Sequence, residues 1–580
     1  MRICSAGIDR NKASFQLSFD GRPVIAYPGE SLAAALLSAD ERMLRITSAG
    51  QGRGLFCGMG VCGECTVIVD GVSRRACMTP AQSGQSVTTA PARAAVGPVP
   101  PAQSALPTAT PDVLVIGAGP AGLSAARSAA LAGLSVLVAD ERGKAGGQYF
   151  KQPGSGFKVD PSRIDQQFRE GADLFESTKA AGVQFIFDTQ LWSAERDAVT
   201  GALRLGLLGA GRIFLALPKR LVLATGAYER AFPFPGWTLP GVMTTGACQT
   251  LLRAYQTAPG RRVLVAGNGP LNLQVAVELQ HSGVEVVALI EQASAPSLAR
   301  VGDAARLALS APNLVGDGIA QLALLRRKGV PLLYRHVVVE AEGEGAVRRV
   351  RVGQIGQDGH IVPASIRTFE ADALCVGMGF LPQAEVARAL GCRFDDAPGG
   401  PGLIAVRDAV GRSSVDNVFI VGDGGGLGGA RVAMAQGMLA GTEAATDLGQ
   451  TLSGGLKAES AAARRALARH LRFQKALWRL YAPAKLCGPV ATAQTLLCRC
   501  EDVSYGTIEK LIAGGLTDIG SIKRQCRAGM GRCQGRYCGA LIRNMLGSQP
   551  GASLDKGFAP RSPFKPVPIA ALASSASSAK

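Results

Sequence analysis

The sequence has no long apolar run and contains few histidines or aromatic residues. No apolar stretch reaches the roughly 18 residues of a membrane-spanning helix, and the opening segment MRICSAGIDRNKASF lacks the apolar core of a secretory signal. We therefore expect a soluble, cytoplasmic protein. The formal net charge of +18 comes from scattered Lys and Arg, without an arginine-rich run or interleaved aromatic residues. Nucleic-acid binding is therefore not predicted, whereas an acidic partner subunit would be attracted.

Histidine is too scarce to support histidine-based catalysis. The four histidines lie outside every motif described below; they are His281, His336, His360 and His470. A histidine acid or base, or a Cys–His nucleophile, therefore has little support. At 580 residues the chain exceeds the about 250 to 300 residues at which a single core stops growing, so several domains are expected. Cysteine is plentiful, with 14 residues, and clustered thiols in a reducing compartment indicate metal ligands rather than disulfides.

The first cysteine set lies in the segment GLFCGMGVCGECTVIVDGVSRRACMTP. Its members are Cys57, Cys62, Cys65 and Cys77. The spacing C-x4-C-x2-C with a more distant fourth cysteine is typical of a plant-type [2Fe-2S] cluster, whereas zinc sites favour paired C-x2-C knuckles. Two strands are predicted within residues 15–27 and a short helix over residues 30–39. This module resembles the ferredoxin-like domain at the front of heterotetrameric sarcosine oxidase alpha subunits, which implies a β-grasp fold.

Residues 112–148, DVLVIGAGPAGLSAARSAALAGLSVLVADERGKAGGQ, contain a complete dinucleotide-binding pattern. An apolar strand leads into Gly117, Gly119 and Gly122, and an alanine-rich helix follows. The first glycine would make the tight turn, the second would let a pyrophosphate approach, and the third would let helix and strand pack closely. A second apolar strand ends at Asp140, which is placed to accept hydrogen bonds from ribose hydroxyls.

Three further segments extend this nucleotide-binding pattern. They are AGGQ with Gly147 and Gln148, LVLATGA with Thr225 and Gly226, and VFIVGDGGGLGGARVAMAQG with Gly422 and Asp423. Together with the first motif they resemble the flavoproteins that have two dinucleotide-binding domains. The resemblance implies a multidomain, Rossmann-like α/β fold that binds FAD, with Asp423 holding the ribityl or pyrophosphate region of the flavin.

A second, related pattern lies between these halves. The strand RVLVA is followed by Gly267 and Gly269, by a helix, and by a strand that ends at Glu291. The third glycine is replaced by Asn272, which weakens the NAD interpretation, and no arginine directly follows Glu291 to hold a 2′-phosphate. We expect an inserted domain that binds NAD or another adenine nucleotide, and a degenerate structural domain remains the alternative. Related disulfide reductases carry a redox C-x2-C here, but this sequence has only Cys248, which we interpret as a core residue.

The second cysteine set lies near the end of the chain. Its members are Cys498, Cys500, Cys533 and Cys538. The spacings C-x-C and C-x4-C, with two short helices predicted between them, resemble the bacterioferritin-associated ferredoxin type of small helical [2Fe-2S] domain. Cys526 lies off this pattern. Zinc remains an alternative for this set, because four thiolates suit both metals.

The motifs and the composition divide the chain into eight segments. They are a ferredoxin-like domain (1–85), a Pro/Ala-rich linker (86–111), a first FAD-binding part (112–240), an inserted NAD-type domain (241–370), a second FAD-binding part (371–450), a helical connector (451–490), a C-terminal [2Fe-2S] domain (491–548) and a disordered tail (549–580). The linker cannot form a core, so the first module could be mobile. The connector helix has apolar and basic faces, and we expect it to pack on the flavin domain rather than on a membrane.

The order of these modules is more specific than any one of them. With the stretches ERAFPFPGWTLPGVMTTGACQTLLR and CRAGMGRCQGRYC, it is similar to the alpha-type subunits of bacterial amine and amino-acid dehydrogenases. These include hydrogen cyanide synthase, opine oxidase, proline and hydroxyproline dehydrogenases and the N-terminal half of sarcosine oxidase alpha.

This resemblance implies an oxidoreductase subunit that acts on CH–NH or CH–NH2 donors. A partner FAD-containing beta subunit would oxidise an opine, a proline derivative, glycine or a similar compound, and this chain would pass the electrons to an acceptor. An FMN at the subunit interface is a further expectation from related complexes. Two alternatives remain open: a self-sufficient NADH-dependent flavin and iron–sulfur reductase, and a non-enzymatic iron–sulfur sensor or scaffold.

Overall fold

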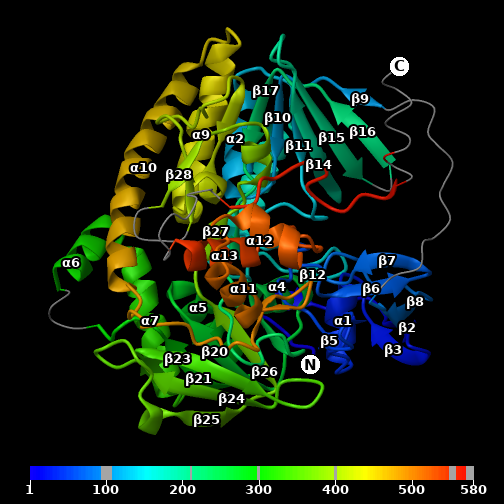
Figure 1. Cartoon of the computed structure of the whole chain (residues 1–580). Helices are drawn as coiled ribbons and strands as arrows, with labels where there is room; N and C mark the ends of the chain where they lie inside the picture. Colours follow the sequence, from blue (N-terminus) through cyan, green and yellow to red (C-terminus); the bar gives the residue numbers. More distant parts are fainter. Residues whose placement is uncertain are drawn as a thin grey trace.

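The computed structural model describes residues 1–92, 107–209, 212–296, 301–397, 402–547 and 557–569, together with Leu572. Figure 1 shows two α/β domains, one above the other, with the N-terminal module beside them and the C-terminal helices between all three. Among the described residues, no helix is long and apolar enough to cross a bilayer. The predicted linker falls mostly on residues 93–106, which lie outside the described residues.

The N-terminal module is a five-stranded sheet covered by one helix. The strand order is β3-β2-β8-β6-β7, and only the β2–β8 pair is parallel. The elements are β2 (Phe15–Phe19), β3 (Arg22–Ala26), α1 (Leu32–Ser38), β6 (Thr66–Val69), β7 (Val72–Arg75) and β8 (Ser86–Thr89). Ser31 begins α1 by accepting a hydrogen bond from the Ala34 amide. The two predicted strands and the predicted helix are confirmed, and the cysteine loop lies between the short strand β5 (Gly52–Arg53) and β6.

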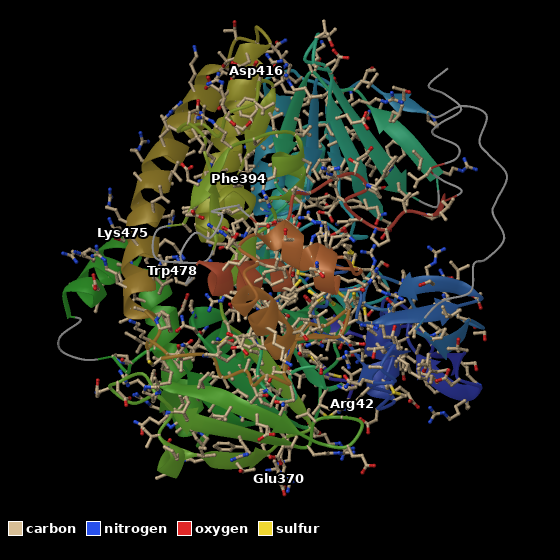
Figure 2. The ribbon with its side chains drawn as sticks, in the orientation of Figure 1. Arg42, Glu370, Phe394, Asp416, Lys475 and Trp478 are labelled. Carbon is tan, nitrogen blue, oxygen red and sulfur yellow. The ribbon has the colours of Figure 1, made fainter. Side chains whose placement is uncertain are left out.

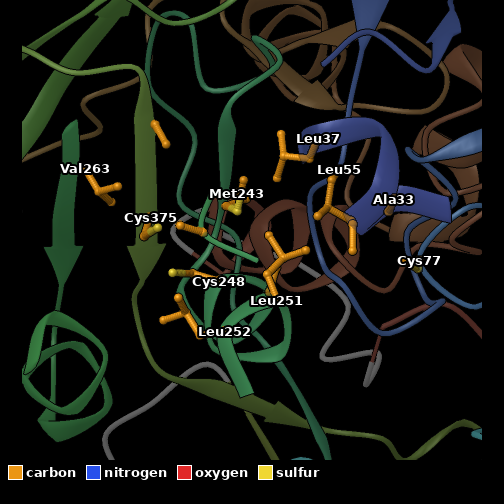
Figure 3. Packing of buried hydrophobic residues seen from close by; sticks show 14 of the residues in the cluster. Ala33, Leu37, Leu55, Cys77, Met243, Cys248, Leu251, Leu252, Val263 and Cys375 are labelled. Carbon is orange, nitrogen blue, oxygen red and sulfur yellow. The ribbon is translucent and has the colours of Figure 1, made fainter. Parts of the chain in front are cut away.

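This module is docked on the second α/β domain. Leu37 and Leu55 share a buried core with Met243 and Leu251 of that domain, as Figure 3 shows. The guanidinium of Arg42, labelled in Figure 2, donates 2.8 and 3.1 Å hydrogen bonds to backbone carbonyls of the same domain. From the composition of the linker we expected that the first module could be mobile. In the structure the module is docked, because burial of this apolar surface stabilises the contact.

The flavin-type domain is built on a parallel sheet with the order β13-β11-β10-β17-β30. The strands are β10 (Val113–Ile116), β11 (Val136–Ala139), β13 (Gln184–Ile186), β17 (Arg220–Leu223) and β30 (Val418–Ile420). Successive residues of β10 point to opposite faces. Val113 and Val115 pack with the helices α2 (Pro120–Leu131) and α9 (Gly429–Asp447), whereas Leu114 and Ile116 pack with a second sheet. The strands of that sheet are β9 (Thr108–Ala109), β14 (Thr189–Arg196), β15 (Leu203–Gly209) and β16 (Arg212–Ala216).

Helices α2 and α9 approach very closely at two glycines. A Cβ on Gly437 would lie 2.1 Å from the carbonyl oxygen of Ala121, and one on Gly441 would lie 2.2 Å from that of Ala125. Any larger residue at either position would therefore push the helices apart. The long helix α10 (Gly454–Leu480) packs against α9, as expected for the connector. Lys475 and Trp478, labelled in Figure 2, lie near its C-terminal end.

The second α/β domain repeats the first, with the parallel strand order β19-β26-β20-β21-β22. Its strands are β19 (Val242–Thr244), β20 (Arg262–Gly267), β21 (Glu285–Glu291), β22 (Leu332–Tyr334) and β26 (Ala373–Gly377). Its helices are α4 (Thr245–Tyr255), α5 (Pro270–His281), α6 (Val301–Ser310) and α7 (Pro312–Arg327). An antiparallel sheet of β23 (His336–Glu342), β24 (Arg349–Gln354) and β25 (Arg367–Glu370) completes it.

The C-terminal domain is small and mostly helical. Its elements are β31 (Leu496–Cys498), β32 (Val503–Ser504), α11 (Tyr505–Ala513), α12 (Ile519–Cys526) and α13 (Cys538–Leu546). Figure 1 shows its helices in the centre of the molecule, between the flavin-type domain and the second α/β domain. The two helices predicted between its cysteine pairs are α11 and α12.

Part of the expected disordered tail is instead packed against the flavin-type domain. Phe564 is buried in the core beneath the β14–β15 sheet, and its amide donates a 2.9 Å hydrogen bond to the carbonyl of Trp192. Lys565 pairs with Glu141. Arg536 and Gln190 also donate hydrogen bonds to the carbonyls of Phe564 (3.1 Å) and Pro566 (3.0 Å), and Phe558 packs on the C-terminal domain. These contacts anchor the segment, although its composition suggests disorder. The remainder of the predicted tail, apart from Leu572, lies outside the described residues.

Candidate flavin and iron–sulfur sites

The predicted flavin-binding residues gather at one edge of the first parallel sheet. Strands β10, β11, β17 and β30 run in the same direction and end directly before these residues. The residues concerned are Gly117, Gly119 and Gly122, Asp140, Thr225 and Gly226, and Gly422 and Asp423. Ligands of open α/β sheets bind at this carboxyl edge. The structure therefore brings sequence motifs from both ends of the flavin-type domain together at one edge of the sheet.

The glycine loop has the shape that a pyrophosphate requires. Gly117 has φ of +106°, and a Cβ on Gly122 would lie 1.8 Å from the Gly117 carbonyl oxygen. The N-cap of α2 is Gly119, and no side chain accepts a hydrogen bond from the first turn of this helix. Gly147 packs directly on this loop, since its own Cβ would lie 2.8 Å from the Gly119 Cα. The free N–H groups at the start of α2 therefore fit an anionic phosphate.

Two buried carboxylates hold the loops of this edge. Asp140 accepts hydrogen bonds from the amides of Ala118 (2.6 Å) and Arg142 (2.8 Å), and burial raises its pKa. Asp423 accepts 2.9 Å hydrogen bonds from the Gly428 and Gly429 amides, and burial raises its pKa as well. Each carboxylate therefore fixes a glycine-containing turn, and the predicted contacts of Asp140 with ribose and of Asp423 with flavin remain predictions.

Two buried ionisable residues next to this edge were missed by the sequence analysis. Lys151 donates hydrogen bonds to the Gln148 carbonyl (2.6 Å) and the Gln249 side chain (2.7 Å), and burial lowers its pKa to about 7. Glu229 accepts from the Gly246 amide at the start of α4 (2.9 Å), and burial raises its pKa to about 7. Both groups can therefore exchange protons near neutral pH. Lys151 lies three positions after Gln148, and Glu229 lies three positions after Gly226, so each follows the end of a flavin motif. This spacing was the available sequence signal for both residues.

The second dinucleotide fold keeps the strand, turn and helix of its motif. The polar side chains of the motif, however, form hydrogen bonds within the domain. Glu291 accepts hydrogen bonds from the amides of Gly269 (3.1 Å) and Ala293 (2.8 Å), and burial raises its pKa to about 7. Asn272 is buried, and its amide donates to the carbonyl of Gly377, a neighbour of Gly267 (2.9 Å). The residue in the third glycine position therefore ties helix α5 to strand β26 through a hydrogen bond.

The chain segment that follows α10 crosses the edge of this second fold. The side-chain amide of Asn268 donates to the Tyr481 carbonyl (2.9 Å), and that of Gln292 donates to the Ala484 carbonyl (3.1 Å). The Ala484 amide donates back to Gln292, and Pro483 forms a β-bridge with Ala293. This segment thus occupies backbone and side-chain groups next to Gly269 and Glu291.

The four thiols of the first cysteine set are buried and arranged in pairs. The Cys62 amide donates to Cys57 Sγ at 3.4 Å, and the thiols of Cys65 and Cys77 are hydrogen-bonded to each other. Burial would raise the pKa of Cys57, but hydrogen bonds from Cys62 and from the Met59 and Val61 amides lower it to about 6. Burial and the Cys57 thiol raise the pKa of Cys62, and the Cys65 thiol and burial raise that of Cys77, so the four thiols do not ionise alike.

The second cysteine set forms one continuous group of thiols. The Sγ atoms of Cys500 and Cys533 are 3.6 Å apart, and the Cys498 thiol is hydrogen-bonded to those of Cys500 and Cys538. Cys526 is not part of this group, since its thiol donates to the Ile522 carbonyl within α12. Cys248 lies fully buried beside Cys375, as expected of a core residue (Figure 3).

The paired thiols of the first set fit a two-iron cluster. A [2Fe-2S] cluster with four cysteines takes two at each iron. The four neighbouring thiols of the second set suit a [2Fe-2S] cluster and zinc alike. The two thiol sets are also adjacent. One small cavity is lined by Cys62, Glu64, Cys498, Arg499, Cys500, Cys533, Tyr537 and Cys538.

Comparison with known proteins agrees with this arrangement of domains. Residues 111–437 match the pyridine nucleotide-disulphide oxidoreductase family, and this match covers more than half of the chain. The chain belongs to that family. Residues 12–92 match a 2Fe-2S iron-sulfur cluster binding domain, and residues 496–548 match a BFD-like [2Fe-2S] binding domain. The predicted fold class, an α/β flavoprotein between two [2Fe-2S] domains, is therefore confirmed.

Relatives over most of the chain are oxidoreductase subunits. An opine oxidase subunit of Agrobacterium tumefaciens is 32% identical over 80% of this chain and 91% of its own length. Hydrogen cyanide synthase subunit HcnB of Pseudomonas protegens is 31% identical over 79% of this chain and 96% of its own length. The solved structure of L-proline dehydrogenase from P. horikoshii superposes with a TM-score of 0.69 at 22% identity, covering 96% of this chain and 97% of that one. The resemblance drawn from the sequence is confirmed by these relatives, and the solved structure supports the fold.

Proposed function

We propose that the chain is the electron-transfer subunit of a heteromeric dehydrogenase or oxidase that acts on a secondary amine or an amino acid. One observation carries the proposal: a flavin-binding edge and two thiol sets meet within a single chain. Cys57, Cys62 and Cys533 lie in one buried core together with Trp237 and Tyr537. A bound flavin exchanges electrons in pairs and each [2Fe-2S] cluster takes one, so this combination supplies conversion between two-electron and one-electron transfer.

We assign the cofactor-binding roles to the residues that the sequence predicted. The FAD would be held by Gly117, Gly119, Gly122, Asp140, Gly147, Gln148, Thr225, Gly226, Gly422 and Asp423. The clusters would be held by Cys57, Cys62, Cys65 and Cys77, and by Cys498, Cys500, Cys533 and Cys538. Metal and flavin analysis of the full-length chain tests this assignment. We expect one flavin and two irons per thiol set, whereas zinc in the second set would contradict it.

A partner is part of the proposal. An FAD-containing beta subunit would oxidise the amine in the cytoplasm, and this chain would carry the electrons to an acceptor. The opine oxidase and hydrogen cyanide synthase relatives are themselves named as subunits, which supports a hetero-oligomer. The formal charge of +18 suits an acidic partner surface. An FMN between the two subunits, as in related complexes, belongs to the same proposal.

A self-sufficient NADH-dependent reductase is the second candidate, because the second domain retains Gly267, Gly269 and Glu291. The segment from Tyr481 to Ala484 argues against it, since this segment lies where a dinucleotide would approach. The Glu291 carboxylate also holds the Gly269 amide instead of remaining free for a ribose. We expect anaerobic NADH to leave the flavin absorbance of the holo chain unchanged, and rapid bleaching would favour the reductase.

A non-enzymatic iron–sulfur sensor or scaffold is the third candidate. It is disfavoured by the four strand ends that converge on the flavin-binding edge. The flavin content of the purified chain distinguishes a scaffold from an electron-transfer subunit, because a scaffold does not require stoichiometric flavin. A chain that holds both clusters but no flavin after reconstitution with FAD would favour the scaffold.

A further inference from the structure

The two proposed cluster loops contact each other through residues that lie inside their own ligand motifs. Glu64 stands between the second and third cysteines of the first set, and Arg499 stands between the two cysteines of the C-x-C motif. Arg499 Nε lies 3.4 Å from Glu64 Oε2. Arg532, next to the third cysteine of the second set, donates a 2.9 Å hydrogen bond to the Thr66 hydroxyl. The loops are therefore in direct polar contact.

This junction contains more positive than negative charge. Glu64 is also paired with Arg45 at 2.7 Å and with Arg53 at 3.5 Å, and Arg53 pairs with Asp502 at 2.9 Å. The Glu64 side chain is 1% exposed, and those of the three arginines are between 2% and 5% exposed. Three guanidinium groups thus face two carboxylates, and Arg532 adds a fourth guanidinium, which leaves two uncompensated positive charges. A buried charge acts strongly, because little water screens it.

Aromatic rings fix the position of Arg499. Its guanidinium lies 3.9 Å from the ring centroid of Phe56 and 4.6 Å from that of Trp237. It also donates a 2.6 Å hydrogen bond to the Trp237 carbonyl. The edge of the Phe56 ring in turn contacts Trp237 and Tyr537. This cation–π arrangement keeps the charge in one place between the loops.

The positive charge faces both thiol sets. Cys62 of the first set lines the same cavity as all four thiols of the second set, and so do Glu64 and Arg499. Arg45 interacts electrostatically with both Cys62 and Cys500. The Nε atoms of Arg45 and Arg53 are buried and make no hydrogen bond within the described residues. Donors of this kind suit an anionic neighbour.

We propose that the two clusters exchange electrons directly across this junction, and that its fixed positive charge raises both reduction potentials so that the pair stores two electrons. The inference rests on the proposed function, because it requires a [2Fe-2S] cluster in each thiol set. The reduced flavin of the same chain, as the anionic hydroquinone, would supply two electrons and release one proton to water. Each cluster would take one of the two electrons. Arg499 is a positioning residue, since it acts through its charge and through Glu64.

The test uses the full-length holo chain and three variants. Arg499→Gln removes the charge, Arg499→Lys keeps it, and Arg349→Gln removes an arginine from the exposed surface of β24 as a matched control. Electron paramagnetic resonance of the fully reduced wild type should show broadening or splitting from interaction between two reduced clusters. In potentiometric titrations we expect both potentials to fall in Arg499→Gln, to be largely restored in Arg499→Lys, and to stay unchanged in the control.

The outcomes separate this inference from the function on which it rests. Two independent cluster signals in a chain with full iron and sulfide, or unchanged potentials in Arg499→Gln, would overturn the inference and leave the proposed function standing. Missing iron in the wild type would instead contradict the cluster ligands themselves. If Arg499→Gln fails to fold, Arg45→Gln provides the same loss of charge on the side of the first module.

Discussion

At the scale of single residues, two ionisable side chains lie buried next to the flavin-binding edge, Lys151 and Glu229. Gly117, Gly122 and Asp140 could be predicted, because their roles follow from the chemistry of a nucleotide loop. Lys151 and Glu229 each lie three positions beyond a flavin motif, but that spacing does not show that tertiary packing buries them at 4% exposure. A charged side chain is usually found at the surface. Only the fold therefore reveals groups that titrate near neutral pH.

Glu229 makes the stability of the chain depend on pH. The carboxyl has a pKa near 4.5 in the unfolded chain, and burial raises it to about 7 in the folded chain. The unfolded chain therefore loses its proton first, and stability falls as pH rises from about 4.5 to about 7 and remains reduced above this range. At about 1.4 kcal/mol per pKa unit, the loss is at most on the order of 3 kcal/mol.

Glu229→Gln should remove this loss. We expect the variant to match the wild type near pH 5 and to unfold at a temperature a few degrees higher than the wild type at pH 8. Thermal unfolding at both pH values measures the effect. Glu370→Gln, which changes an exposed glutamate at the outer surface in Figure 2, serves as the control. An equal pH dependence in wild type and Glu229→Gln would show that Glu229 does not titrate in this range.

Replacement of Cys62 tests the proposed first cluster. Cys62 pairs with Cys57 and also lines the cavity shared with the second cysteine set. Replacing Cys62 with Ser should remove one reduced-cluster signal in paramagnetic resonance and lower the iron content by about one cluster. Cys526→Ser is the matched control, since that thiol donates to a carbonyl within α12 and should leave both signals intact. A full spectrum from Cys62→Ser would remove this residue from the ligand set.

At the scale of elements, periodicity and capping predicted the strands and helices well, but their docking was not predictable. The strands of the N-terminal module and the helix over Leu32–Ser38 follow from apolar alternation and from the Ser31 cap. The contact of this module with the second domain depends on residues such as Leu37 and Met243, which are far apart in sequence. The prediction of a disordered tail was wrong for residues 557–569 for a related reason. Composition describes an average, whereas this segment is anchored by particular contacts such as the burial of Phe564 and the packing of Phe558.

Phe564 tests the packing of that tail segment. The side chain is 3% exposed, and truncation of a buried phenylalanine typically costs about 3 to 5 kcal/mol. Phe564→Ala should therefore loosen residues 561–569 and make them sensitive to limited proteolysis, whereas Phe558 should stay packed on the C-terminal domain. Ile569→Ala, which changes a residue that is 72% exposed, should behave like the wild type. Equal proteolysis of both variants would contradict an anchoring role for Phe564.

At the scale of the whole molecule, the C-terminal domain determines how the modules work together. Its helices lie between the other domains in Figure 1, and its cysteine loop contacts the first module through Arg499 and Glu64. Trp237 of the segment that joins the two α/β domains donates a 2.7 Å hydrogen bond to the carbonyl of Leu496. The C-terminal domain therefore directly contacts both the first thiol loop and the segment between the two α/β domains. Each of these modules could be predicted from the sequence. The contacts between the modules could not, because they join residues that are far apart in the chain.

The measurement that tests this account most directly is an anaerobic absorbance titration of the holo chain with a panel of secondary amines and amino acids. It is performed with and without the co-purified flavoprotein partner, and NADH is added in a separate experiment. We predict that the flavin and cluster absorbance of this chain bleaches only when partner and amine are both present, and the reactive amine then identifies the substrate class. Bleaching by NADH alone, or by an amine without the partner, would contradict an electron-transfer subunit.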